Sequence, residues 1–433
     1  MRKTGNLTAK DARKKRTGAT PNQVGVGLKS ALALARPSSW TPPREARDSF
    51  PSRNDRQEGG AAQGHGPKPL STPIYQTSAF QFHSLEELQQ AMENWDYTYS
   101  RLRNPTIEAL ELEVARLEGA EKSVAFASGM AAISTTVLAL AHGGHIVAMR
   151  DLYGATGKLL TDLTKFGIET SFVPTDRPDG ALKAARPNTK LLYLETPTNP
   201  TIKIVDIPEW VGIAKKIGAK TAIDATFATP YNLKPLALGI DVVIHSMTKF
   251  MSGHEATLGG VASGSRSTMK PIEDLRIYLG GVMDPHQAWL TSMGMKTLSV
   301  RMTRHNANAA ALAAFLASHP KVSNVNYPGL KTSRYFALSK KLLRSPGGVL
   351  SFELKGGVPA VRALVANLRL ARLAPTLGGI STIVTHPYST SHRWVTEAVR
   401  QEMGVTPGLL RVSCGIDDTG DLIADFENAL EVA

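Results

Sequence analysis

Short apolar segments alternate with amphipathic segments from about residue 106 onward. Residues 106–119 (TIEALELEVARLEG) place apolar side chains at helical spacing and end on a glycine, which predicts a helix. The same patterns predict further helices at 129–141 and 155–167, and short strands at 123–128, 145–150, 169–174, 190–195, 221–225 and 241–246. Short apolar strands that alternate with helices are typical of a mostly parallel sheet covered on both faces.

The pattern changes near residue 300. A long helix is predicted at 301–319, and strands of a second sheet at 322–329, 347–357 and 409–416. We therefore predict a large α/β domain at 106–300 and a smaller C-terminal α+β domain at 301–433.

Composition limits the class of protein. The chain has 433 residues, of which 42% are hydrophobic, so it is long enough for two or three domains with sizeable cores. No apolar run approaches the roughly 18 residues of a membrane span, so we expect no membrane partner. Cys414 is the single cysteine, which excludes an internal disulfide and fits a cytoplasmic protein.

The formal net charge of +13 is concentrated at the N-terminus. Residues 1–70 contain 14 Lys and Arg against 5 Asp and Glu, and they include the run KDARKKR. Because this segment is also rich in Pro, Gly and Ser, we predict a basic, disordered tail at 1–68. A targeting peptide or a weak polyanion-binding arm remains an alternative for the tail. The rest of the chain is nearly balanced in charge, so a nucleic-acid partner is not expected.

Polar residues follow several of the predicted strands. In an open parallel sheet, ligands bind beyond the carboxyl ends of the strands, so these side chains are expected to converge. They are Ser128 and Gly129, Tyr153, Glu195 and Asn199, Asp224, and finally Ser246, Thr248 and Lys249. No His/Cys cluster suggests a metal site.

These residue types suit pyridoxal phosphate. The cofactor needs an amine to form a Schiff base, a carboxylate for its pyridine nitrogen and donors for its phosphate. Lys249 offers the amine, Asp224 the carboxylate, and the backbone N–H groups of Gly129 and Met130 at a helix N-terminus offer donors. Taken singly, Lys249 also fits a snorkelling or paired lysine, and Asp224 fits an ordinary turn or cap residue.

Seven motifs resemble those of one enzyme family, in that family's order. They are YSRLRNPT, SGM, DLYG, ETPTNP, DATFATP, HSMTKF and GLLRVSCGIDD, and they span about residue 69 to the C-terminus. The chain is similar here to the Cys/Met-metabolism (trans-sulfuration) family of pyridoxal-phosphate-dependent enzymes, of the cystathionine γ-synthase/γ-lyase type. The resemblance implies the fold-type I transferase fold, with an N-terminal arm at 69–105, and a homodimer or homotetramer with shared active sites.

The resemblance also implies a role for each matching position. Lys249, Asp224 and Tyr153 would be catalytic. Lys249 would carry the cofactor and shuttle protons, Asp224 would pair with the pyridine nitrogen, and Tyr153 would stack on the ring. The other implied cofactor ligands are Ser128, Gly129, Met130, Asn199, Ser246 and Thr248, with Tyr99 and Arg101 reaching the phosphate from a neighbouring subunit. Arg411 would bind the substrate α-carboxylate, with Ser381 close by.

The implied reaction is γ-elimination or γ-replacement on a sulfur-containing or O-acylated homoserine-type L-amino acid. Alternatives are β-elimination, methionine γ-lyase activity, aminotransfer, or a non-catalytic binding protein. Four departures from the family pattern bear on substrate choice: Ala155, Ala225, the GHEA turn at 253–256, and Ile380 before Ser381. Ala155 disfavours methionine γ-lyase activity, because typical members have cysteine at that position.

Overall fold

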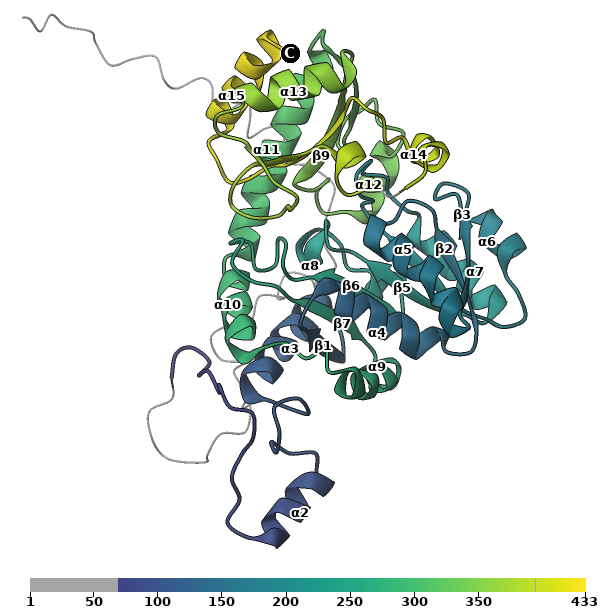
Figure 1. The fold of residues 1–433 in the computed structure, drawn as a ribbon, viewed down its shortest axis with the longest axis vertical. Coiled ribbons are helices and arrows are strands. Elements are labelled where there is room, and N and C mark those ends of the chain that lie inside the picture. Colours follow the sequence, from purple (N-terminus) through teal and green to yellow (C-terminus); the bar gives the residue numbers. More distant parts are fainter. Residues whose placement is uncertain (1–68, 394) are drawn as a thin grey trace, which may run out of the picture. The chain divides into compact units, whose positions relative to one another are not determined.

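The computed structural model describes residues 69–393 and 395–433, which all belong to one compact unit (Figure 1). The tail predicted at 1–68 lies outside the described residues. No helix in the described part of the chain is long and apolar enough to cross a membrane.

The larger sheet has seven strands in the order β1-β7-β6-β5-β4-β2-β3. Their bounds are β1 Lys122–Phe126, β2 His145–Met149, β3 Glu169–Val173, β4 Thr189–Glu195, β5 Lys220–Asp224, β6 Val242–Ser246 and β7 Gly260–Gly264. β2 to β6 pair in parallel, whereas β7 lies antiparallel between β6 and β1. The register aligns Glu195 with Asp224, so two carboxylates end neighbouring strands.

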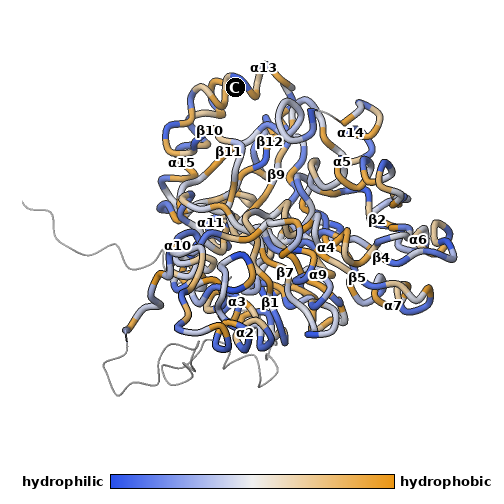
Figure 2. Tube along the Cα trace, turned by 60° about the horizontal axis from the view of Figure 1, so that its bottom comes forward, coloured by the Kyte–Doolittle hydropathy of each residue, from blue (hydrophilic) through white to orange (hydrophobic). Residues whose placement is uncertain are grey.

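Helices surround this sheet, and one of them, α4, begins shortly after β1 ends. They are α3 Pro105–Glu118, α4 Gly129–Ala141, α5 Gly154–Asp162, η2 Leu163–Phe166, α6 Asp179–Ala184, α7 Ile207–Ile217, α8 Thr229–Asn232, η3 Leu236–Leu238, α9 Arg266–Leu279 and α10 Pro285–Met295. Figure 2 shows hydrophobic and hydrophilic positions alternating along α7, as expected for a helix with one buried face. The buried core of this region is dominated by Val, Ile, Leu and Ala from the parallel strands.

The smaller sheet has five strands in the order β10-β11-β12-β9-β8. The remaining elements are α11 Leu298–Ser318, β8 Val322–Asn326, α12 Phe336–Leu342, β9 Val349–Leu354, α13 Gly357–Asn367, β10 Arg372–Leu373, β11 Ile383–Thr385, η4 Pro387–Ser389, α14 Glu397–Met403, β12 Leu409–Ser413 and α15 Thr419–Glu431. β12 is paired on both sides, and its Arg411 aligns with Thr385 on β11 and Ser351 on β9. A separate core holds this sheet against α11, α13 and α15.

The predicted fold class is confirmed: a mostly parallel sheet with helices, followed by a second, smaller sheet. The predicted boundary at residue 300 falls in the first turn of α11, which begins at Leu298, and the exact domain limits stay a prediction. In the N-terminal arm, α2 (Leu85–Glu93) has no buried residue.

Candidate functional site

Lys249 lies in the turn after β6, where its amine is largely removed from water. Its Nζ donates to Thr376 Oγ1 at 3.0 Å, so the lysine contacts the loop between β10 and β11 of the smaller sheet. Burial, helped by the positive charge of Arg411, lowers the pKa of Lys249 to about 8. A substantial fraction of the amine is therefore neutral near physiological pH, as a nucleophile or general base requires.

The loop between β10 and β11 packs closely on the Lys249 turn. Gly378 has φ +79°, and a Cβ there would lie 2.5 Å from the backbone nitrogen of Phe250. Only glycine satisfies both the left-handed backbone and this close approach. This contact brings Thr376, two residues earlier, to the amine of Lys249.

Arg411 enters the same region from the central strand of the smaller sheet. It is 4% exposed, and its Nη atoms donate to Asn199 Oδ1 at 2.9 Å, to the Thr376 carbonyl at 2.9 Å and to Thr385 Oγ1 at 3.2 Å. Its Nε has no partner, and no carboxylate of the described chain pairs with it. Burial lowers the pKa of Arg411 to about 10. A buried guanidinium that keeps a free donor is suited to a carboxylate ligand.

Asp224 and Glu195 form a buried pair of carboxyl groups on neighbouring strands. Asp224 Oδ1 accepts from the Thr226 N–H at 2.9 Å, and Glu195 accepts from the N–H groups of Tyr153 at 2.7 Å and Asn199 at 3.0 Å. Burial raises the pKa of both groups, and the charge of Asp224 raises that of Glu195 further, well above its ordinary value. Glu195 therefore holds the backbone of Tyr153 and Asn199 in place, while a cation beside Asp224 would offset the cost of burying its charge.

The N-terminus of α4 meets the end of β6. Ser128 caps this helix by accepting from the Ala131 N–H at 3.1 Å. A Cβ on Gly129 would lie 2.8 Å from the Cβ of Ser246, so only glycine permits the contact. The first N–H groups of a helix lack partners within the helix and attract anions. Gly129 and Met130 supply such groups here.

Thr226 and Thr248 organise the neighbouring turns. Thr226 Oγ1 accepts from the Ser246 N–H at 2.8 Å, so Thr226 joins the Asp224 turn to the end of β6. Thr248 Oγ1 accepts from the Gly259 N–H at 3.1 Å, which fastens the residue before Lys249 to the approach to β7.

Tyr153 is one of the exposed residues among the predicted cofactor ligands. Its side chain is 40% exposed at the N-terminus of α5, directly after the chain leaves β2. A partly exposed aromatic side chain whose backbone is held in place is suited to stacking on a planar ligand.

Three predicted residues do not join this group within one chain. Ser381 is half-buried, and its N–H donates to Glu255 Oε1 at 3.3 Å instead of contacting Lys249 or Arg411. Tyr99 is 44% exposed, and Arg101 Nη1 donates to the Ile277 carbonyl at 2.8 Å. Glu255, which belongs to the GHEA turn that departs from the family pattern, therefore contacts the loop that also carries Thr376.

Sequence reasoning missed several residues that now border the site. Thr376, Thr385 and Thr226 make the contacts given above, and none of them was predicted as a site residue. Thr376 follows a proline in a loop without periodicity, so no pattern pointed to it. Two residues beside the motifs are buried: His245 Nε2 lies 2.6 Å from Glu118 Oε1, and burial raises the pKa of the Cys414 thiol. No cluster of metal ligands occurs among the residues that the structure describes.

The pocket fits pyridoxal phosphate in three independent ways. A lysine with a lowered pKa can react with the aldehyde of the cofactor. A buried carboxylate without an ion-pair partner can accept a hydrogen bond from a protonated pyridine nitrogen. A helix N-terminus that begins with a closely packed glycine can bind the phosphate. Lys249, Asp224 and the Ser128–Gly129 turn supply these features. This combination defines a class, the enzymes that use pyridoxal phosphate.

Comparisons with known proteins identify the family. The family described as Cys/Met metabolism PLP-dependent enzyme matches residues 58–431. The chain belongs to this family, which confirms the resemblance and the cofactor.

Individual relatives differ in the reaction that they are named for. L-Methionine gamma-lyase of Fusobacterium nucleatum subsp. nucleatum is 42% identical over 373 residues, covering 84% of this chain and 93% of that protein. Cystathionine beta-lyase MetC of Bacillus subtilis is 42% identical over 365 residues, covering 84% and 92%. The crystal structure of cystathionine gamma-lyase from Lactobacillus plantarum complexed with L-serine has a TM-score of 0.79 at 36% identity, covering 84% and 93%.

Proposed function

We propose that the chain catalyses γ-elimination or γ-replacement on an L-amino acid with a leaving group at Cγ, such as cystathionine or an activated homoserine. The observation that carries this proposal is the pair formed by Arg411 and Lys249. A buried guanidinium with a free donor lies next to a lysine whose pKa its charge helps to lower. Arg411 recognises an α-carboxylate, and Lys249 provides an amine close to the α-carbon.

Each residue of the site has its own role in the proposed reaction. Arg411 binds the substrate carboxylate, and the Asn199 amide oxygen fixes the orientation of the guanidinium. Lys249 would hold the cofactor through its amine until the substrate binds. It then removes the α-proton and moves protons at Cβ, while Thr376 holds the amine in reach. Bound pyridoxal phosphate supplies the electron sink that stabilises negative charge at Cα.

Asp224 and Tyr153 would support the cofactor ring. Asp224 would lie beside the pyridine nitrogen, where a carboxylate favours the protonated ring. Tyr153 stacks on the ring, with its backbone held by Glu195. Ser128, Gly129, Met130, Ser246 and Thr248 would surround the phosphate, with the α4 N-terminus as its main donor.

β-Elimination is the second candidate reaction. The relative named cystathionine beta-lyase MetC is as similar to this chain as the relative named methionine gamma-lyase. In β-elimination the leaving group departs from Cβ after loss of the α-proton, so Lys249 needs to move only one proton. Ala155 continues to disfavour methionine γ-lyase activity.

We further propose that two chains share each active site. Tyr99 and Arg101 lie on the N-terminal arm and are exposed in the single chain. The arm also exposes Leu85 at 63%, Met92 at 53% and Trp95 at 53%, which is costly unless a second copy covers them. From that copy, Arg101 would reach the neighbour's phosphate.

The decisive experiment is a product analysis. Purified protein is incubated with cystathionine, O-acetylhomoserine, O-succinylhomoserine or methionine, with and without cysteine or sulfide. γ-Elimination gives 2-oxobutanoate and ammonia, γ-replacement gives a new thioether or thiol, and β-elimination of cystathionine gives homocysteine and pyruvate. Pyruvate as the main product from cystathionine would overturn the γ-reaction in favour of the second candidate.

The role of Lys249 is tested separately. Borohydride reduction of the cofactor-loaded protein, followed by peptide mapping, should find the pyridoxyl group on Lys249. Lys249→Ala should lower turnover by about 10⁴-fold or more, because it removes both covalent attachment and proton transfer. A label on another lysine would contradict the assignment.

A further inference from the structure

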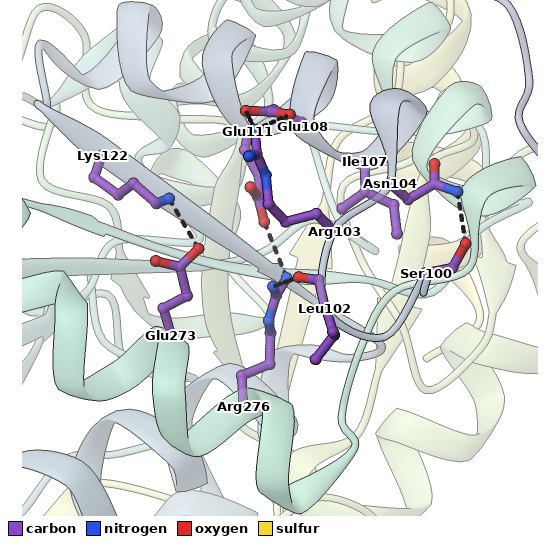
Figure 3. Close-up of a pocket in the computed structure, with 10 residues that line it drawn as sticks. All are labelled: Ser100, Leu102, Arg103, Asn104, Ile107, Glu108, Glu111, Lys122, Glu273 and Arg276. Atoms are coloured by element: carbon purple, nitrogen blue, oxygen red, sulfur yellow. Dashed lines mark hydrogen bonds and ion pairs between the residues drawn. The ribbon is translucent and has the colours of Figure 1, made fainter. Parts of the chain in front are cut away.

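A buried polar network lies beneath the segment that carries Arg101. We call residues 99–104 the strap. Figure 3 shows Arg276 of α9 between Glu111 of α3 and the carbonyl of Leu102 in the strap. Arg276 is 3% exposed and Glu111 9%, so this ion pair is almost completely removed from water. The cavity beside it has a volume of about 20 Å³, which holds no ligand larger than a water molecule.

The pair first holds the strand that leads to the phosphate turn. Glu111 Oε1 accepts from the Ala125 N–H at 2.8 Å, and Arg276 Nη1 donates to the Ala125 carbonyl at 3.1 Å. Both backbone groups of Ala125 are thereby fixed. Ala125 lies three residues before Ser128, which caps α4, so the pair sets the starting position of the Ser128–Gly129 turn.

The same arginine also holds the strap. Arg276 Nη2 donates to the Leu102 carbonyl at 3.3 Å, and Leu102 directly follows Arg101. The next residue of α9, Ile277, offers its carbonyl to Arg101 Nη1 at 2.8 Å. One turn of α9 thus contacts both the backbone next to Arg101 and the side chain of Arg101.

A stabilising role alone explains this arrangement poorly. Burial raises the pKa of Glu111, and the charge of Arg276 only partly offsets that cost. Buried ion pairs often add little net stability compared with apolar side chains of the same size, whereas they hold a specific geometry. The three backbone groups that the pair contacts lie in the two segments that lead to phosphate-binding residues.

We propose that Glu111 and Arg276 are positioning residues that set the phosphate-binding groups of two cofactor sites from within one chain. The inference rests on the proposed sharing of sites between chains. The Ser128–Gly129 turn serves the site of its own chain, whereas the strap serves the site of the neighbour. Loss of the pair in one chain therefore weakens the phosphate grip at both sites.

Mixed dimers that contain a single competent lysine separate the two effects. Lys249→Ala in one chain leaves only the partner able to attach pyridoxal phosphate, and attachment is measured by borohydride trapping over a cofactor titration. In the first dimer the pair is removed from the chain with the intact Lys249. In the second it is removed from the Lys249→Ala chain, so only the strap supplied to the competent site is altered.

The double change Glu111→Leu with Arg276→Met removes the pair without leaving a buried charge unpaired, so folding should be retained. The matched control is Lys122→Gln with Glu273→Gln. That ion pair, at 2.8 Å, joins the same strand β1 to the same helix α9, but it contacts neither Ala125 nor the strap (Figure 3).

In both mixed dimers the pair variant should raise the dissociation constant of pyridoxal phosphate about tenfold, the size expected for loosening charge-assisted contacts to phosphate. The control should change it less than about twofold. At saturating cofactor, KM for the amino-acid substrate should be unchanged, which general damage to the fold would not allow. Weakening in only one of the two dimers, or equal weakening by the control, would overturn the proposal.

A third mixed dimer tests the underlying assumption by itself. It joins an Arg101→Ala chain to a Lys249→Ala chain, so its competent lysine lies on the chain with the altered strap. Tight cofactor attachment excludes an action of Arg101 within its own chain, as the proposed function requires. Weak attachment means that Arg101 acts within its own chain, and then the proposal of shared sites fails rather than the role of Glu111 and Arg276.

Discussion

Two buried arginines, Arg301 on α11 and Arg411 on β12, have almost the same surroundings by simple measures. Each is 4% exposed, and burial lowers the pKa of each to about 10. Among residues 69–393 and 395–433, the hydrogen-bond partners of both are carbonyl, amide and hydroxyl oxygens, and none is a carboxylate. A buried cation without a counter-ion is costly, so each needs an explanation.

The difference lies in how their donors are used. The Arg301 donors reach Thr297 Oγ1 at 3.0 Å and the carbonyls of Phe250 at 2.7 Å, Met251 at 3.2 Å and Gly294 at 2.9 Å. Every nitrogen of Arg301 is therefore occupied by the protein. Arg411 leaves its Nε without a partner. We call Arg301 saturated, because the protein uses all of its donor nitrogens, and it holds the turn after Lys249. Arg411 is unsaturated, because its Nε remains available to a ligand. Arg276 also has an unpartnered Nε, but it is paired with Glu111, so Arg411 stands out by combining a free donor with the lack of a carboxylate partner.

The largest expected effect comes from removing the unsaturated arginine. Arg411→Met should lower kcat/KM for the amino-acid substrate by about 10³-fold, because the α-carboxylate loses a bidentate, desolvated partner. The change is measured by steady-state kinetics at saturating cofactor.

The same variant should lose less stability than Arg301→Met, because it removes an uncompensated buried charge and leaves only one backbone carbonyl, that of Thr376, without its donor. A large loss of stability would mean that Arg411 holds the smaller sheet together as Arg301 holds its turn, and the comparison would fail.

The sequence predicted the architecture well where its patterns are regular. The strands β2 to β6 and the helices α3 and α4 were recognised because buried parallel strands and amphipathic helices have distinct periodicities. β7 was missed, since its sequence GVASG is rich in small residues and is not distinguishable from a loop. The position of β7 beside β6 depends on long-range pairing, which no local pattern encodes.

The candidate site was predictable only in part, for a similar reason. Lys249 and Asp224 follow buried strands, so strand ends together with family motifs pointed to them. Thr376 and Arg301 act through contacts with residues more than 50 positions away. Their place depends on how the smaller sheet and α11 meet the Lys249 turn, which sequence periodicity does not specify.

The second largest effect should come from the saturated arginine. Arg301→Met leaves the carbonyls of Phe250, Met251 and Gly294 without their donor, so the free energy of unfolding should fall by about 3 kcal/mol. Urea titration of the cofactor-loaded protein measures it. At low temperature, where the variant is folded, KM for the amino acid should change little. A KM increase equal to that of Arg411→Met, with stability unchanged, would show that Arg301 binds substrate.

A smaller effect is expected from Arg411→Lys. Lysine keeps the charge but loses the planar fork, so it can contact only part of the carboxylate. We expect KM to rise about 30-fold while kcat and the absorbance spectrum of the bound cofactor remain nearly normal. Unaltered KM would indicate that charge alone matters at this position, and the free Nε would lose its significance.

The smallest effect concerns the pH dependence of Lys249. Burial and the nearby charge of Arg411 together lower its pKa to about 8, with burial the larger cause. A cation disfavours the protonated lysine, so its removal in Arg411→Met should raise this pKa, while continued burial keeps it below the ordinary value for lysine.

The attachment of pyridoxal phosphate to cofactor-free protein requires the neutral amine of Lys249, so the rate of attachment reports this pKa. Normalised to a free model amine, this rate should rise with pH through a midpoint near 8 in the unaltered protein and at a higher pH in Arg411→Met. Arg301→Met serves as the control, since its charge is not among the causes of the Lys249 shift and its midpoint should stay near 8. Equal midpoints in all three proteins would show that Arg411 does not act on Lys249 electrostatically, and the two arginines would then differ only in their free donor.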